Sequence, residues 1–301
     1  MFDRISDVVI EDEALRDGLQ IEKRLFSVEQ KLDLITDIVA AGVRRVQVGS
    51  FVHPRWVPQM ANTDAVFAAL APVAGVTYTA LILNMAGLER ALAARVKHLS
   101  ISVSASETHS QKNTNKSVAD ALAGIQPTIE RALGEGIAVR AGIQSALGCG
   151  FEGRIPLEQV LKIARIYNDL GVGEINIADT AGLSNPKWTY EVCARVREAV
   201  RPDVRLSLHL HDTRGLGIAN MVAGLQAGVT VFDAAVGGLG GCPFIPAASG
   251  NIATEDAVFA LEEMGVATGI DWRRLTGVTH KLETLLGRRL PGRMAHLDQA
   301  A

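Results

Sequence analysis

The stretch EINIADTAGLSNPKWTYEVCARVREAVRPDVRLSLHLH, residues 174–211, contains the unit that decides the fold. A short β-rich run over 174–177 is followed by a helical stretch, which opens where Asn185 precedes Pro186 at the first helical position. A second β-rich run follows over 205–211. Neighbouring parallel strands need a crossover of this kind, so the unit predicts a parallel sheet.

The same unit recurs along the whole chain of 301 residues. Candidate strands cover 8–10, 45–48, 77–83, 98–103, 138–144, 174–177, 205–211 and 231–235. Seven helical stretches with a period near 3.6 lie between them, and the strands read as buried on both faces. The pattern predicts one α/β domain over 1–301, a (β/α)8 TIM barrel with 254–290 as additional C-terminal helices. The alternative is an open doubly wound sheet, but no strand-Gly-x-Gly-x-x-Gly-helix unit stands near the start.

Several helix boundaries are marked by specific residues. Ser27 followed by Gln30 reads as a capping box, in which both side chains satisfy free backbone N–H groups. Pro127 lies inside the stretch 118–134 and predicts a kink or a split there, since proline removes a helical hydrogen bond. Glycines follow four helical runs and predict helix ends at Gly42, Gly171, Gly228 and Gly265.

Composition excludes several classes of protein. The chain is 48% hydrophobic, which is too much for a disordered chain, and its net charge of -3 argues against a broad polyanion-binding surface. Aromatic residues make up 5%, too few to favour a base-stacking platform, so no nucleic-acid partner is expected. Three cysteines form no CxxC pair. There is no secretory signal pattern and no apolar run near ~18 residues, which predicts no membrane partner and a cytoplasmic location.

Polar residues collect where the predicted strands end, which is the catalytic face of a TIM barrel. His209 and His211 are two apart on one strand, so both point to the same face, at the barrel mouth. Two imidazoles there are good metal ligands, although two hydrogen-bonded structural histidines are the alternative. Asp17 could add a carboxylate and Asn251 a carbonyl oxygen. Such mixed ligation suggests Mg²⁺ or Mn²⁺, with Co²⁺ or Zn²⁺ also compatible.

The glycine-rich loop 237–241 follows the eighth predicted strand. Its glycines could simply form a tight turn, or they could let the loop move and carry Cys242 over the mouth. Because Cys242 lies in a loop between Gly241 and Pro243, we favour a role as proton donor or acceptor over one as a small core residue.

A set of motifs resembles the 3-hydroxy-3-methylglutaryl-CoA lyase family of metal-dependent TIM-barrel lyases and Claisen condensing enzymes. The motifs are Arg16-Asp17-Gly18-Leu19-Gln20, Ser50-Phe51-Val52, Trp56-Val57-Pro58-Gln59-Met60, Lys112-Asn113, His209-Leu210-His211-Asp212, Gly237-Gly238-Leu239-Gly240-Gly241-Cys242-Pro243 and Gly250-Asn251. The resemblance covers nearly the whole chain.

The resemblance implies a function and a set of roles. A divalent-metal-dependent carbon–carbon lyase would cleave an acyl-CoA substrate, 3-hydroxy-3-methylglutaryl-CoA or a closely related 3-hydroxyacyl-CoA, to acetyl-CoA and a ketone such as acetoacetate. It also suggests a homodimer. The implied metal ligands are Asp17, His209, His211 and Asn251; Arg16 would neutralise the enolate oxygen, Cys242 would act on the mobile loop, and Ser50, Lys112 and Asn113 would contact coenzyme A or substrate.

The chain departs from the family pattern around the mouth. Gln47 stands where these lyases usually carry Glu, so a proton shuttle or an ionic contact to Arg16 would have to come from elsewhere. Ala14-Leu15 replaces the usual Gly-Pro, and His109 stands where an apolar residue is expected. These differences leave a different 3-hydroxyacyl-CoA, such as citramalyl-CoA, as an alternative substrate.

Two further functions remain as alternatives. Condensing enzymes of the isopropylmalate synthase kind look as though they carry Glu where this chain has Leu19, and they lack the glycine-cysteine loop. A non-catalytic metal-binding barrel is the other, because one fold hosts many functions.

Overall fold

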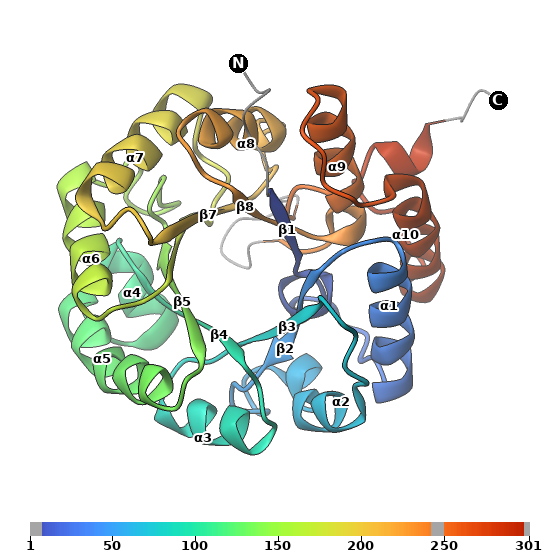
Figure 1. Cartoon of the computed structure of the whole chain (residues 1–301), viewed down its shortest axis with the longest axis horizontal. Coiled ribbons are helices and arrows are strands. Elements are labelled where there is room, and N and C mark those ends of the chain that lie inside the picture. Colours follow the sequence, from blue (N-terminus) through green and yellow to red (C-terminus); the bar gives the residue numbers. More distant parts are fainter. Residues whose placement is uncertain (1–7, 242–249, 298–301) are drawn as a thin grey trace.

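The computed structural model describes residues 8–241 and 250–297, in which eight parallel strands close into a barrel. The strands pair in sequence order, and β8 closes the ring by pairing with β1 (Figure 1). Their bounds are β1 Val9–Asp12, β2 Arg45–Ser50, β3 Thr77–Leu81, β4 His98–Ser104, β5 Ala138–Gln144, β6 Glu174–Asp179, β7 Arg205–Leu210 and β8 Val231–Ala234. The predicted TIM barrel is confirmed, and the open doubly wound alternative is wrong.

Helices form a ring around the barrel (Figure 1). They are α1 Val28–Ala40, α2 Thr63–Ala69, α3 Met85–Ala93, α4 Glu107–Thr114, α5 Val118–Gly134, α6 Leu157–Asp169, α7 Pro186–Ala199, α8 Gly217–Gln226, α9 Thr254–Glu263 and α10 Trp272–Leu286. The range 254–290 holds two helices, as predicted. Of these, α9 follows β8 and packs against α8, while α10 packs between α9 and α1.

The marked helix boundaries are present, with one exception. Ser27 and Gln30 form the predicted capping box before α1. The four glycines predicted to end helices all adopt positive φ: Gly42, Gly171, Gly228 and Gly265. Pro127, however, lies inside the uninterrupted helix α5, so the predicted split is wrong. Pro127 and Ala123, four residues before it, are both exposed, so water can reach the carbonyl that loses its hydrogen bond.

The interior of the barrel is polar, whereas TIM barrels usually fill this space with branched apolar side chains. Strand β5 shows the pattern, because Val139, Ala141 and Ile143 join the hydrophobic core while Arg140 between them bonds to carboxylates from β1 and β8. Bonds that span the barrel in this way require inward side chains. Strand β5 thus packs helices on its outer face and takes part in a charged network on its inner face.

None of the helices in the described part of the chain is both long enough and apolar enough to cross a membrane.

Candidate active site

A single π-helical turn, η1 (Ala14–Gly18), follows β1 and carries Arg16 and Asp17. Turns of this kind are frequent at functional sites, because the wider ring re-aims the side chains of the segment. Gly18 ends the turn against Leu239, and a Cβ atom on Gly18 would lie only 3.0 Å from that side chain. The glycine thus allows the turn to pack beneath the loop that follows β8.

Two imidazoles from β7 meet Asp17 at the barrel mouth. The Nε2 atoms of His209 and His211 are 3.0 Å apart, and Oδ2 of Asp17 lies 3.7 Å from Nε2 of His211. Asn251 pairs with His211 through an isolated β-bridge and donates from Nδ2 to Oδ2 of Asp17 at 2.9 Å. The prediction that His209 and His211 share one face is confirmed, and the four predicted ligands lie together.

The donor set fits a divalent cation. Ligand atoms of Asp17, His209 and His211 all lie within 4.8 Å of one another. The two Nε2 atoms face each other, so at most one proton can lie between them, whereas a cation can take both lone pairs. Oδ1 of Asn251 is buried and finds no hydrogen-bond partner among the described residues, which is unusual for an amide oxygen. Two imidazole nitrogens with carboxylate and amide oxygens are the mixed set expected for such an ion.

Asp233 in β8 supports His209 from behind. Its Oδ2 lies 3.2 Å from Nδ1 of His209, and its Oδ1 accepts from Arg140 at 2.5 Å. Asn176 donates to the same carboxylate at 3.2 Å. A carboxylate behind a metal-binding imidazole fixes the tautomer and the ring orientation, leaving Nε2 free as a ligand atom.

Arg16 is held by three acceptors. Its Nε donates to Oε1 of Gln47, its Nη1 donates to Oδ1 of Asp17 at 2.5 Å, and its Nη2 donates to Oε2 of Glu13. Although burial works in the opposite direction, the positive charge of Arg16 holds the pKa of Asp17 well below its usual value. Asp17 is therefore an ionised oxygen ligand at neutral pH.

A cavity of about 230 Å³ opens at this site. Its walls include Arg16, Asp17, His209 and His211, together with Asn113 of α4. Other residues near the mouth complete the lining, among them Val52, Val57 and Leu83 from loops and His109 from α4. The cavity therefore extends from the predicted metal ligands to the segments that follow β2, β3 and β4 at the mouth.

The remaining predicted residues lie around this cavity or outside the described chain. Gln47 is fully buried under Arg16. Ser50 is buried at the end of β2, where no side chain or backbone group in the described part of the chain hydrogen-bonds its hydroxyl. Lys112 is exposed, with its Nζ 5.0 Å from the ring centre of Phe151. Cys242 lies outside the described residues.

The described part of the glycine loop needs its glycines. Gly237, Gly238 and Gly240 have φ values of 71°, 69° and 125°, a region that other residues rarely adopt. A Cβ atom on Gly240 would lie 2.7 Å from Nδ2 of Asn251. The loop therefore packs closely on a predicted ligand.

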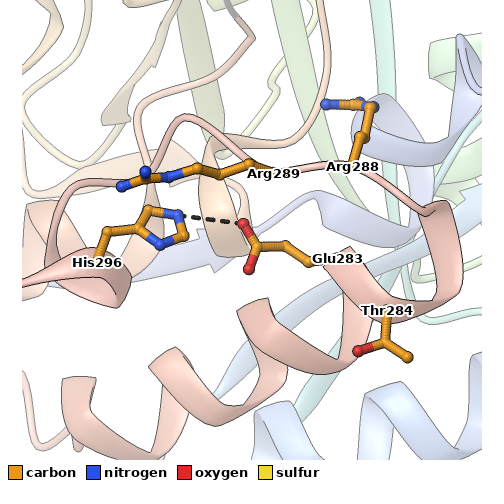
Figure 2. A pocket seen from close by; sticks show the side chains of 5 residues that line it. All are labelled: Glu283, Thr284, Arg288, Arg289 and His296. Carbon is orange, nitrogen blue, oxygen red and sulfur yellow. Dashed lines mark ion pairs between the residues drawn. The ribbon is translucent and has the colours of Figure 1, made fainter.

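A second group of potential ligand atoms lies at the end of α10 and has a local explanation. Glu283 pairs with Nε2 of His296 at 3.1 Å (Figure 2). It also accepts from the backbone N–H of Leu290 at 2.7 Å. Nε2 of His280 lies 2.8 Å from the carbonyl oxygen of Ala295. Arg289 lines the same surface hollow, and its charge disfavours a cation there. These contacts fix the segment after α10 and define no second centre.

A family model described as HMGL-like matches residues 7–281. The chain belongs to the HMGL-like family. Among its relatives, hydroxymethylglutaryl-CoA lyase YngG of Bacillus subtilis is 38% identical over 286 residues, which are 95% of each chain. The (R)-citramalyl-CoA lyase of Chloroflexus aurantiacus is 40% identical, covering 94% of this chain and 92% of the relative.

Solved structures agree with this membership. The HMG-CoA lyase of Acinetobacter baumannii, in complex with coenzyme A and 3-methylmalate, superposes with a TM-score of 0.92 at 37% identity, over 98% of this chain and 96% of that one. The family resemblance predicted from the motifs is confirmed, as is the TIM-barrel fold that it implies.

Sequence reasoning missed the residues beneath the site. Glu13, Arg140 and Asp233 are buried in the barrel and contact Arg16 or His209 directly or through one another. A signal was present, since Arg140 and Asp233 are charged residues with an apolar residue on either side in their strands. A charge at such a position requires a buried partner.

Proposed function

We propose that this chain is a divalent-metal-dependent carbon–carbon lyase that cleaves 3-hydroxy-3-methylglutaryl-CoA to acetyl-CoA and acetoacetate. One observation carries the proposal. The four ligand residues, Asp17, His209, His211 and Asn251, converge at the barrel mouth beside a guanidinium group that lines the same cavity. The family membership and the names of the relatives support the same reaction.

The metal, proposed to be Mg²⁺ or Mn²⁺, would be held by these four side chains and supplies a positive charge that lowers the pKa of a bound hydroxyl group. A base takes the proton of the substrate's 3-hydroxyl, and that oxygen becomes the carbonyl of the ketone as the C2–C3 bond breaks. The electron pair of that bond moves into the thioester carbonyl as an enolate. A proton delivered to C2 then completes acetyl-CoA. The other product is the ketone.

Arg16 is proposed to stabilise the enolate oxygen. Its guanidinium is permanently charged and lines the cavity, and its three contacts hold it in one orientation before substrate arrives. A charge that is already in place needs no reorganisation during bond cleavage, which is why such groups contribute strongly to rate. Gln47 contributes by accepting from Nε of Arg16.

Other predicted roles are carried forward with this reaction. Cys242 is proposed to deliver or accept the proton at the enolate carbon. Asn113 lines the cavity, and the exposed Lys112 precedes it in the last turn of α4, so both are proposed to contact coenzyme A. Ser50, whose hydroxyl has no partner within 8–241 and 250–297, is proposed to contact the substrate.

A second candidate substrate is citramalyl-CoA. Polar His109 lies in the wall of the cavity, and the lyase from Chloroflexus aurantiacus that carries this activity in its name is 40% identical. The homodimer and the cytoplasmic location stay predictions from the sequence.

The deciding experiment supplies the purified protein with Mg²⁺ or Mn²⁺ and a panel of 3-hydroxyacyl-CoA thioesters, and measures acetyl-CoA release. We expect the highest kcat/KM with 3-hydroxy-3-methylglutaryl-CoA, and loss of release in the His209→Ala variant. Preference for citramalyl-CoA would favour the second candidate. Metal binding without release from any thioester would favour a non-catalytic barrel, and acetyl-CoA consumption with a 2-oxo acid would favour a condensing enzyme.

A further inference from the structure

Arg16 contacts one carboxylate that belongs to the ligand set and one that does not. Asp17 is the first, and Glu13, which directly follows β1, is the second. The third contact is the neutral amide of Gln47. Glu13 is fully buried and does not line the cavity, so it acts on any substrate only through the side chains it contacts, Arg16 among them.

Glu13 connects three charged or ligand groups at once. Its Oε1 accepts from Nη2 of Arg140 at 2.7 Å, and its Oε2 accepts from Nη2 of Arg16. The same Oε2 lies 3.5 Å from Nδ1 of His209. Both oxygens of Glu13 are therefore committed, and Arg16 is linked through one side chain to the network that also supports His209.

Gln47 has only one amide orientation that satisfies its surroundings. Its Nε2 donates to Oε1 of Glu11 at 3.1 Å and to Oγ of Ser100 at 3.3 Å, which directs Oε1 to Arg16. A rotated amide would set a donor against the guanidinium and an acceptor against a carboxylate. A glutamate at this position would place a second buried carboxylate oxygen against Glu11, with no proton between them.

We propose that Glu13 is the positioning residue for Arg16, and that position 47 carries an uncharged side chain because Glu13 and Glu11 already supply the negative charge. This inference rests on the proposed function of Arg16. A glutamine at 13 cannot replace the carboxylate, since its oxygen would accept from one guanidinium while its amide group would point a donor at the other. Arg16 would then lose its fixed orientation.

The test compares Glu13→Gln, Gln47→Glu and the double variant that exchanges the two side chains. For Glu13→Gln we expect kcat to fall about 100-fold, the cost typical of a misplaced catalytic group, with KM and Mn²⁺ affinity within about fivefold of the parent. Gln47→Glu should also lose activity. The double variant, which returns a second carboxylate to Arg16 beside Asp17, should recover at least about tenfold over Glu13→Gln.

Glu174→Gln is the matched control, because Glu174 is a buried barrel carboxylate that bonds Arg45 instead of Arg16. Its kcat should stay within about threefold of the parent even if stability falls. Should Glu13→Gln fail to fold, Glu13→Asp keeps the charge and shortens the reach, and a fall in kcat at constant KM is expected.

A Glu13→Gln or Glu13→Asp enzyme with parental kcat would overturn the inference, as would a fully active Gln47→Glu enzyme or no recovery in the double variant. A crystal structure of the position-13 variant separates this inference from the proposed function. If the parent cleaves no thioester, the proposed lyase function is wrong. Displacement of Arg16 in the variant would still support the positioning role of Glu13. An unmoved Arg16 contradicts it.

Discussion

Oδ2 of Asp233 lies 3.2 Å from Nδ1 of His209, and the opposite nitrogen of that ring lies 3.0 Å from Nε2 of His211. A proton held between Asp233 and Nδ1 leaves the lone pair of Nε2 facing the mouth of the barrel. One buried carboxylate on β8 thus decides which nitrogen of a β7 histidine can bind a cation.

Removing that charge should weaken metal binding. In Asp233→Asn the single oxygen can accept from Arg140 or His209 but not from both, so the ring loses its fixed tautomer. We expect Mn²⁺ affinity, measured by calorimetry, to fall about 10- to 100-fold. The exposed Asp203→Asn serves as control. Unchanged affinity in a folded Asp233→Asn protein would show that the ring is oriented by something else.

Arg16→Lys should separate charge from geometry. A lysine keeps the positive charge but has no planar fork, so it cannot bond Glu13, Asp17 and Gln47 at once. We expect kcat to fall about 10²- to 10³-fold with little change in KM, because the lost interaction forms mainly in the transition state. Arg131→Lys, on the surface of α5, should match the parent. A rise in KM as large as the expected fall in kcat would instead assign Arg16 to substrate binding.

The parts of this site that the sequence predicts are those with local signals. The spacing of His209 and His211 puts both on one face of a strand, and the alternation of strands and helices brings Asp17 and Asn251 to the same rim. The bounds of the eight strands are predicted to within a few residues for the same reason, since each is a short β-rich run between helical stretches.

The contacts beneath the rim have no such local signal. Glu13 and Arg140 are 127 positions apart in sequence and meet only because the barrel closes. The polar interior was also not predicted, because a charged residue inside an apolar run shows that a partner is needed but not which one. The π-helical turn at 14–18 likewise depends on packing against Leu239.

Arg140 should be essential to the stability of the barrel. It bonds Glu11, Glu13 and Asp233 in the interior, and all four side chains are buried. Arg140→Met would leave three carboxylates without their shared cation, which should lower the free energy of unfolding by about 3–5 kcal/mol. Urea unfolding followed by circular dichroism measures this, with Arg131→Met, expected within about 1 kcal/mol of the parent, as the surface control. If Arg140→Met changed the free energy of unfolding as little as the surface control does, Arg140 would not be essential to the stability of the barrel.

Lys31 predicts a specific dependence of stability on pH. Burial lowers the pKa of its ammonium group to about 8, and the group donates to neutral oxygens of Gln59 and Asn62. The folded state therefore releases this proton before the unfolded state does. Between about pH 8 and pH 10.5 the Lys31 contribution to the free energy of unfolding should rise with pH, by roughly 2–3 kcal/mol.

The comparison that isolates this effect is the parent against Lys31→Met, in urea titrations from pH 7 to pH 10.5. The parent should gain stability relative to the variant across that range. A constant difference between the two proteins would mean that Lys31 keeps its ordinary pKa in the fold.

The central claim is that four side chains at the barrel rim bind one divalent ion. Anomalous diffraction from crystals grown with Mn²⁺ tests this directly. We predict a single strong peak bonded to Asp17, His209, His211 and Asn251, and its loss in His211→Ala. Crystals with ample Mn²⁺ and no peak at these residues, or a peak held elsewhere, would contradict the account.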